Sequence, residues 1–391
     1  MTTLEDVCIR VVDCKNRTAP IDSDGEYFVV GTPAMRGNVI NYEEARRVNA
    51  ETFSIWTERL LPEGGDLLLA REAPVGPIVV VPGGGNVAAG QRTTLLRPDP
   101  TKTDGTFLRH YLASEETQAR LLSLAHGSTT PHLRVADVRN FPVELPSLSE
   151  QQAIAEVLGA FDDKIVANSR TAANATALAN IIYGRAVCGK PERAMSDVLH
   201  PILGGTPARS KSQFWTGTNY WASARDVTGA DHGVIVRTLE TISDSAITTT
   251  KARPLPAGSV ILTARGTVGA VARLGVASSF NQSCYGFEPG RLPAGVLYFA
   301  ILNATERAKA FAHGSVFDTI TMKTFGHLLV PDVPRVEFDA MEARISPLLK
   351  TVDLAVSENQ MLAATRDALL PKLMSGELRV KDTEKSLAGV L

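Results

Sequence analysis

Residues 184–190 have the Gly-x-x-x-x-Gly-Lys spacing of a phosphate-binding loop. Such a loop needs a hydroxyl residue after the lysine to hold magnesium, and it joins a strand to a helix. Here Pro191 follows Lys190, and the segment comes at the end of a helical pattern. The spacing therefore does not predict nucleotide binding.

Other catalytic patterns are missing from the 391 residues. The sequence has no Asn/Asp/Ser-Pro-Pro-aromatic motif of amino-methyltransferases, no Gly-x-Ser-x-Gly and no His-Glu-x-x-His. Pro98-Asp99 begins like a nuclease motif, but no Asp/Glu-x-Lys follows it at the spacing of a neighbouring strand. The four cysteines lack metal-ligand spacing and predict reduced thiols. The sequence therefore predicts a binder or a scaffold without catalytic residues or a bound metal.

A set of Arg, Gln, Ser, Thr and Lys residues lies near the ends of predicted strands. On loops of a rigid scaffold, such side chains suit base edges and phosphates, although ordinary turns use the same residues. The candidates for contact with nucleic acid are Arg71, Gln91, Arg92, Ser128, Thr129, Thr130, Arg209, Lys211, Arg225, Arg265, Thr267, Gln282 and Ser283. The net charge of −2 argues against a general polyanion binder. Charge is unevenly distributed, because residues 1–148 carry a net −4 (15 basic, 19 acidic) and residues 190–334 a net +4 (14 basic, 10 acidic).

The chain matches itself when it is shifted by about 190 residues. Residues 66–76 align with residues 259–269, and Gln91 aligns with Gln282. The match is longest in two helical segments, where apolar residues recur in alternating steps of four and three. Its first positions are Ile154, Leu158, Phe161, Ile165 and Asn168, then Ile345, Leu349, Val352, Val356 and Asn359. This 4,3 repeat is typical of a coiled-coil seam.

Two helices of equal register can pair with each other in an antiparallel coiled coil, or each can pack on its own domain. The matching seam residues Asn168 and Asn359 favour pairing, since a seam Asn fixes register. Pro347 and Pro371 should kink the second helix or start a segment of it. Upstream of each helix, short strands and turns predict a mixed α/β domain, with helices at residues 107–125 and 296–312.

Several motifs together resemble the specificity subunits of Type I restriction-modification enzymes. In the second half these are Gly204-Gly-Thr-Pro, Ala264-Arg-Gly-Thr-Val-Gly269 and Phe280-Asn-Gln282. In the first half they are Arg71-Glu-Ala-Pro-Val-Gly76 and Leu145-Pro-Ser-Leu-Ser-Glu-Gln151, and Leu370-Pro-Lys-Leu-Met-Ser-Gly-Glu377 is similar to the family's terminus. The second junction, Val330-Pro-Asp-Val-Pro334, lacks the usual Glu-Gln pair.

The resemblance implies a mixed α/β fold with two target-recognition domains, held apart by an antiparallel coiled coil of the family's two conserved helices. The implied boundaries are residues 1–148 and 186–333 for the recognition domains, 149–185 and 334–378 for the helices, and 379–391 for a tail. Each domain would read one half of a split duplex DNA target.

The resemblance also implies partners and a place in the cell. Two methyltransferase subunits would bring S-adenosylmethionine, and restriction subunits would bring ATP and Mg, in the cytoplasm and without a membrane. The alternatives are a coiled-coil adaptor that does not read DNA and a fused enzyme, which the missing motifs disfavour.

In this interpretation the coil is a ruler, because a helix of about 34 residues is roughly 50 Å long. Inserting four residues after Asn174 adds about one turn, roughly 6 Å, and nearly keeps the helical phase. We expect a preferred target whose spacer is longer by about one or two base pairs, bound more weakly than the original. A single inserted Gly, the control, should rotate the seam by about 100° and weaken assembly. Methylation of a plasmid library with randomised spacers measures this, and an unchanged spacer with full activity would refute the ruler.

Overall fold

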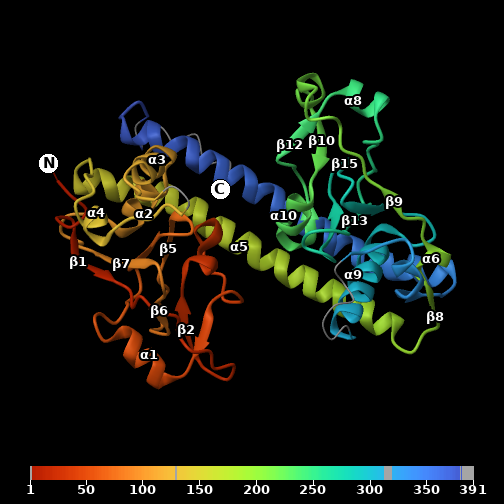
Figure 1. Ribbon diagram of the computed structural model, residues 1–391, viewed down its shortest axis with the longest axis horizontal. Coiled ribbons are helices and arrows are strands. Elements are labelled where there is room, and N and C mark those ends of the chain that lie inside the picture. The colour runs from red at the N-terminus through yellow and green to blue at the C-terminus, as the bar shows by residue number, and fades with distance from the viewer. Residues whose placement is uncertain (1, 128–129, 312–318, 379, 381–391) are drawn as a thin grey trace. The chain divides into compact units, whose positions relative to one another are not determined.

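The chain folds into two compact units in a computed structural model (Figure 1). Unit 1 comprises residues 1–164 and 362–391, and unit 2 comprises residues 165–361. Two helices of 40 residues, α5 (Leu148–Val187) and α10 (Arg335–Met374), each contribute to both units. The predicted mixed α/β fold with two similar domains and two long helices that pack together is confirmed. The residues described are 2–127, 130–311, 319–378 and 380.

Unit 1 centres on a run of apolar residues, Leu67-Leu-Leu-Ala70, all of them buried. A short apolar run without alternation is typical of a strand covered on both faces, and β4 lies between two neighbours in the sheet β1-β7-β4-β5. A second sheet has the order β3-β2-β6. The elements are β1 (Cys8–Asp13), β2 (Tyr27–Val30), η1 (Thr32–Asn38), β3 (Arg46–Val48), α1 (Ala50–Thr57), β4 (Leu67–Arg71), β5 (Val75–Val80), β6 (Val87–Ala89), β7 (Thr93–Pro98), α2 (Gly105–Ala113), α3 (Glu115–Ser123) and α4 (Val135–Arg139).

Unit 2 repeats this topology. Its sheets are β11-β14-β13-β16-β9, β12-β10-β15 and the two-stranded β17-β8, and the buried run Val260-Ile-Leu-Thr263 forms the central strand of the first. The elements are β8 (Glu192–Ala194), α6 (Met195–Val198), β9 (Ile202–Leu203), η2 (Ser212–Trp215), β10 (Asn219–Ala222), α7 (Ala224–Thr228), η3 (Asp231–Gly233), β11 (Val234–Ile235), β12 (Glu240–Ile242), α8 (Asp244–Thr249), β13 (Val260–Thr263), β14 (Val271–Leu274), β15 (Ser279–Phe280), β16 (Cys284–Phe287), α9 (Ala294–Phe311), η4 (Thr324–Gly326) and β17 (Leu329–Pro331). The shared strand order is what the 190-residue repeat predicts.

One predicted helix is divided, and neither proline of α10 starts a segment. The helix expected over residues 107–125 is two helices, because extended Ser114 ends α2 and its hydroxyl caps α3 by accepting from Thr117 N. Pro347 does not start a segment, since α10 begins twelve residues earlier at Arg335, and Pro371 also lies inside this helix. Proline lacks a backbone donor, so the packing of α10 must outweigh one lost hydrogen bond at each site.

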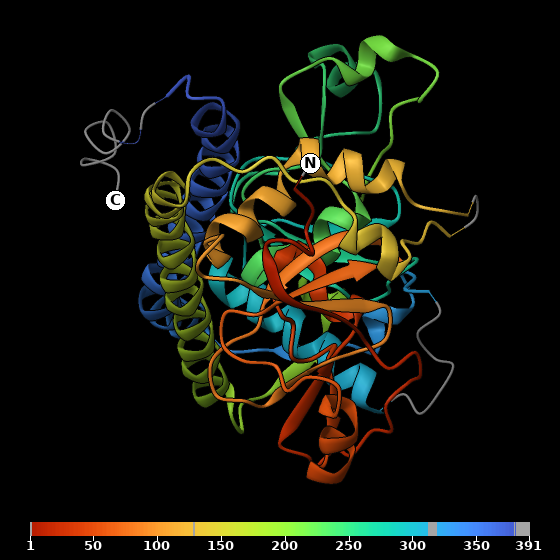
Figure 2. The same ribbon diagram turned by 90° about the vertical axis from the view of Figure 1, so that its left-hand side faces the viewer.

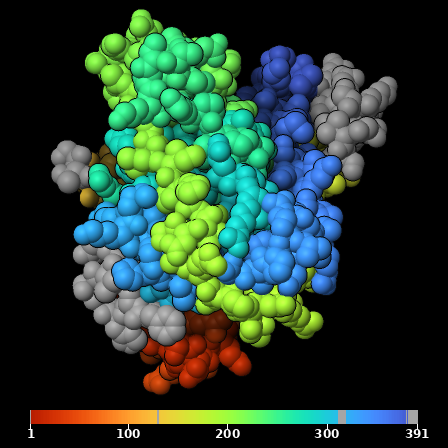
Figure 3. Space-filling view, turned by 90° about the vertical axis from the view of Figure 1, so that its right-hand side faces the viewer, coloured from red at the N-terminus to blue at the C-terminus, as the bar shows by residue number. Residues whose placement is uncertain are grey.

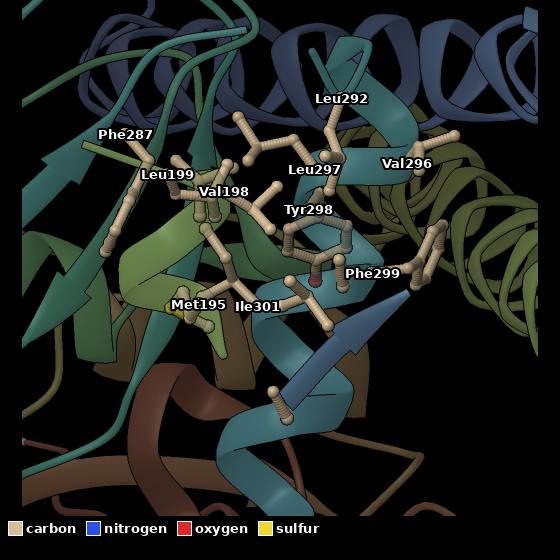
Figure 4. Packing of buried hydrophobic residues seen from close by; sticks show 14 of the residues in the cluster. Met195, Val198, Leu199, Phe287, Leu292, Val296, Leu297, Tyr298, Phe299 and Ile301 are labelled. Carbon is tan, nitrogen blue, oxygen red and sulfur yellow. The ribbon is translucent and has the colours of Figure 1, made fainter. Parts of the chain in front are cut away.

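The largest core of unit 2 forms where α6, α9 and β16 meet (Figure 4). Met195 and Phe299 are fully buried there, and the ring of Phe299 stacks near Tyr183 of α5. Ala179, Ile345 and Leu349 join the same cluster from the two long helices. The recognition part of unit 2 therefore shares one core with its stretches of α5 and α10.

Within each unit, α5 and α10 run in opposite directions (Figures 1 and 2). In unit 1, Ile154, Leu158, Leu370 and Leu373 share one buried cluster. In unit 2, Ala172 and Ala175 pack with Val352 and Val356. The remaining seam positions are buried Phe161 and half-buried Ile165.

The seam asparagines bond across the helix pair of unit 2. Asn168 Nδ2 donates to Glu358 Oε2 at 2.7 Å, and Asn359 Nδ2 donates to Ser169 Oγ at 3.0 Å. A shift of one helix along the other would break both hydrogen bonds. Polar seam residues that fix the register of a helix pair are expected to behave in this way.

Equivalent residues of the two long helices cap helices in their own units. Gln151 Oε1 accepts from the Thr103 hydroxyl at 2.8 Å and from Asp104 N, the N-cap of α2, at 3.1 Å. Glu342 lies 191 residues later and accepts from the backbone nitrogens of Gly295 and Val296 at the start of α9. Because helix N-termini have unpaired N–H groups and positive dipole ends, both contacts stabilise the attachment of a domain to a long helix.

Asp162 of α5 is the centre of an ion cluster in unit 1. Its carboxylate bonds to Arg109 of α2, lies 3.1 Å from His110 Nε2 and accepts from Arg366 of α10 at 2.5 Å. Burial opposes ionisation of this group, but the hydrogen bond with His110, the charge of Arg109 and the hydrogen bond from Arg366 together hold the pKa of Asp162 well below its usual range. Burial also lowers the pKa of His110. One carboxylate therefore links α2, α5 and α10.

We expect Asp162→Ala to destabilise the chain by about 3 kcal/mol at pH 7, because half-buried Arg109 loses its counter-charge and Arg366 keeps only exposed Asp367. Asp163→Ala is the control, since Asp163 is the next residue and is exposed. Because the pKa of Asp162 is lowered on folding, its contribution is full above the ordinary Asp pKa near ~4, begins to fall below it, and is lost only as the pH falls through the lowered folded-state pKa. Denaturant unfolding between pH 7 and pH 3.5 measures both effects. Equal stability of the two variants at pH 7 would contradict the assigned role.

Candidate nucleic-acid interface

In unit 2, two parallel strands bring candidate residues to the same end. β10 and β15 pair with Ala222 opposite Phe280, and Asn281 N donates to Ala222 O at 3.0 Å. The chain leaves both strands at this point, toward α7 with Arg225 and toward the loop with Gln282. Arg225, in the first turn of α7, and Gln282, on the loop after β15, therefore lie at one edge of the sheet.

The turn between β13 and β14 lies beside this loop. Thr263 pairs with Cys284, and Ala264 N donates to Ser283 O at 2.8 Å. The turn reverses through Gly266, whose φ of +79° is in the left-handed region that favours glycine. This places Arg265 and Thr267, both exposed, next to Gln282 and Ser283.

This edge presents cations and hydrogen-bonding groups. Arg225 and Arg265 are exposed, and within the described ranges neither side chain has a hydrogen-bond or ion-pair partner. The exposed Gln282 accepts from the Thr206 hydroxyl through Oε1, which leaves its amide N–H groups available to donate. We call Thr206, Arg225, Arg265, Thr267, Gln282 and Ser283 the Gln282 edge.

Arg209 and Lys211 belong to the part of unit 2 that contains η2 and α8. This part projects from the rest of the unit (Figures 1 and 3). The Arg209 guanidinium lies 3.6 Å from the Trp215 ring centroid and donates to Glu240 at 2.8 Å. This hydrogen bond lowers the pKa of Glu240. Lys211 Nζ lies 5.2 Å from the ring of Phe214. Arg209 is thus already bound within the protein, through Glu240 and Trp215.

Unit 1 builds the same edge from equivalent strands. β2 and β6 are parallel, with Val30 opposite Ala89, and Gly90 N donates to Val30 O at 2.8 Å. A Cβ on Gly90 would lie 2.6 Å from that backbone, so only glycine permits this approach. Arg71 N donates to Arg92 O at 2.8 Å, which repeats the bond between Ala264 and Ser283.

The side chains of this edge differ from those in unit 2. Gln91 Oε1 accepts from the Thr18 hydroxyl at 3.1 Å, as Gln282 does from Thr206. Arg92 Nε lies 3.4 Å from Glu72 Oε1, and their side chains are 42% and 34% exposed, so solvent reaches the pair. We call Thr18, Glu72, Gln91 and Arg92 the Gln91 edge.

The structure gives Arg71 an internal role. Its side chain is only 15% exposed, and it donates to Asp13 Oδ1 at 2.6 Å and to Leu133 O at 2.9 Å. Thr130 is exposed, whereas Ser128 and Thr129 lie outside the described residues. Arg71 therefore braces unit 1, and Arg92 is the arginine that this unit exposes at the edge.

Sequence reasoning missed Thr18, Thr206 and Glu72. Thr18 and Thr206 align at a shift of 188, close to the shift of about 190 that relates the two halves. Only Thr206 belongs to one of the family motifs, Gly204-Gly-Thr-Pro. Glu72 aligns with Arg265 at the shift of 193 that matches residues 66–76 with residues 259–269. Comparing the two halves position by position would have found all three residues.

The chemistry of both edges is that of binding. Among the described residues, no group of three or more His, Cys, Asp or Glu side chains could hold a metal ion. None of the described helices is long and apolar enough to cross a membrane. Exposed Arg, Gln, Ser and Thr side chains on rigid loops can donate to phosphates and to base edges.

Two kinds of comparison place the chain among known proteins. A family model described as the Type I restriction modification DNA specificity domain matches residues 1–175 and again residues 191–360. The chain is similar to the S subunit of a Type-I restriction-modification system from M. genitalium, with 16% identity over 95% of each chain and a TM-score of 0.55, a likeness of fold. The HsdS subunit from Thermoanaerobacter tengcongensis matches with 18% identity over 96% of each chain, but its TM-score of 0.37 is too low to support an argument.

The match to the family model covers most of the chain and occurs twice, as the duplicated topology requires. The protein therefore belongs to the family of Type I restriction modification DNA specificity subunits, the non-catalytic components that give such systems their sequence specificity.

Proposed function

We propose that each unit reads one half of a split DNA target, unit 1 through the Gln91 edge and unit 2 through the Gln282 edge. The observation that carries the proposal is the repetition of one loop framework with different side chains. The backbone bonds and the Thr–Gln contact recur, while the neighbouring residues change from Glu72 and Arg92 to Arg265 and Ser283. Equal frameworks with unequal side chains suit two half-sites of different sequence.

The distribution of charge indicates how strongly this chain binds DNA without its partner subunits. The sequence around the Gln282 edge, residues 190–334, carries a net +4, whereas residues 1–148 carry a net −4. Phosphate neutralisation dominates non-specific affinity for DNA, so unit 1 by itself should bind a duplex weakly. We infer that partner subunits supply much of the phosphate contact, while this chain supplies the reading of sequence.

Assembly with modification subunits follows from the family, and its composition is part of the proposal. The chain carries two equivalent units with two equivalent long helices, so we infer two methyltransferase subunits, each bringing S-adenosylmethionine. Restriction subunits would add ATP and Mg to the same assembly. We infer that this assembly works in the cytoplasm, where it would methylate host DNA and restrict incoming DNA.

An adaptor that joins partners through α5 and α10 without reading DNA would show different binding. A reader should bind a duplex selectively, and its affinity should fall as salt rises. An adaptor should leave the DNA affinity of its partners unchanged. Membership of the DNA specificity family favours the reader.

Exchange of one domain tests whether the units read independently. Replacing residues 190–333 by the equivalent segment of a relative should change one half-site and leave the other intact, because the exchanged segment excludes the residues of the Gln91 edge. Methylome sequencing of cells that carry the chimaera and its partner subunits measures both halves at once. The reciprocal exchange of residues 1–148 is the matched control and should change the other half-site. Alteration of both halves by one exchange would contradict independent reading.

A further inference from the structure

The two edges can be compared position by position because the same backbone bond occurs in both. Arg71 N donates to Arg92 O in unit 1, and Ala264 N donates to Ser283 O in unit 2, each at 2.8 Å. The residue after each donor begins the turn, so Glu72 and Arg265 occupy one position. The residue before each acceptor is glutamine in both units. This equivalence comes from hydrogen bonds and does not depend on sequence alignment.

One part of the edge is constant. Gln91 accepts from Thr18 and Gln282 accepts from Thr206, and both glutamines use Oε1. An amide whose oxygen is engaged can still donate through its nitrogen. Within the described part of the chain, neither amide nitrogen has another partner. The two units therefore offer the same donor at the same place, and this donor cannot distinguish their half-sites.

The other part of the edge differs in charge. In unit 1, Glu72 and Arg92 form a solvent-reached pair with no net charge. In unit 2, Arg265 is exposed and unpaired among the described residues, and the position of Arg92 is taken by the neutral Ser283. The Gln91 edge thus combines a hydrogen-bond acceptor, Glu72, with a donor, Arg92. The Gln282 edge offers the guanidinium of Arg265 without a neighbouring carboxylate partner among the described residues.

We propose that the position shared by Glu72 and Arg265 determines base preference, which rests on the proposed reading of DNA by each unit. Guanidinium groups pair bidentately with O6 and N7 of guanine, whereas carboxylates accept from the exocyclic amino group of cytosine. Arg265 selects guanine in the half-site of unit 2, and Glu72 selects cytosine at the corresponding place in the half-site of unit 1. Ser283 leaves Arg265 free, whereas Arg92 neutralises and orients Glu72.

The test uses the full-length chain, purified with its modification subunits and offered a library of randomised DNA duplexes. Arg265→Ala should abolish the preference for guanine at one position, a loss of about 5- to 150-fold in discrimination, and leave every other position unchanged. Arg265→Glu with Ser283→Arg copies the pair of unit 1 and should convert that guanine to cytosine. Arg344→Ala is the matched control, because Arg344 is an exposed arginine on α10 and its removal changes the net charge equally.

The possible results distinguish failure of base selection by Arg265 from failure of the proposed DNA reading by the two units. If the unaltered chain selects a bipartite motif and the Arg265 variants leave that motif intact, Arg265 does not read a base, although the domains still read DNA. If Arg265→Ala weakens binding equally for all sequences, Arg265 contacts a phosphate and the inference fails. If the unaltered assembly selects no motif, the proposed function fails and takes the inference with it. All three variants replace exposed residues or half-buried Ser283, so thermal unfolding should match that of the unaltered chain.

Discussion

Within each unit, apolar side chains of α5 meet apolar side chains of α10, and the core of the recognition domain closes around this contact. Leu370 and Leu373 complete the cluster that holds Ile154 and Leu158, and Ile345 and Leu349 do the same beside Ala179. Burying one leucine side chain contributes about 1.5–3 kcal/mol. Four such residues from α10 therefore contribute an amount comparable to the whole stability of an ordinary domain. In each unit this core also includes the central strand that leads into an edge, β4 in unit 1 and β13 in unit 2.

In the two halves, equivalent positions of the long helices bond to the recognition domains, but the residue types and their partners differ. Gln151 and Glu342 both bond to the start of a domain helix, although one is an amide and the other a carboxylate. Asp162 and Asp353, also 191 residues apart, both pair with an arginine, but Arg109 comes from helix α2 and Arg273 from strand β14. A carboxylate at a fixed place on a helix can accept a guanidinium from any nearby element. The helices could therefore stay in register while the domains diverged.

The sequence predicted what depends on periodicity and repetition. The apolar runs at Leu67 and Val260 became central strands, and the 4,3 pattern became two long helices. It could not distinguish a bracing arginine from an exposed one, because the Asp13 that pairs with Arg71 lies 58 residues away. The prediction at Pro347 failed for a related reason. The hydrogen bond that proline removes predicted a helix start there, but packing with the rest of the protein keeps α10 continuous through Pro347. Thr18 and Thr206 lie 73 and 76 residues from the glutamines that they bond, so the sequence could indicate them as repeated positions but not as partners of Gln91 and Gln282.

Unit 2 is one uninterrupted stretch of chain, whereas unit 1 needs residues from 362 onward. A ribosome adds about 5–20 residues per second, so some ten seconds or more separate the synthesis of Leu158 from that of Leu370. During that interval the apolar face of the early part of α5 has no α10 to cover it, and exposed apolar surface promotes aggregation. The first domain to be translated is thus the last to close, and a chaperone that shields nascent chains would have its main target at residues 148–164.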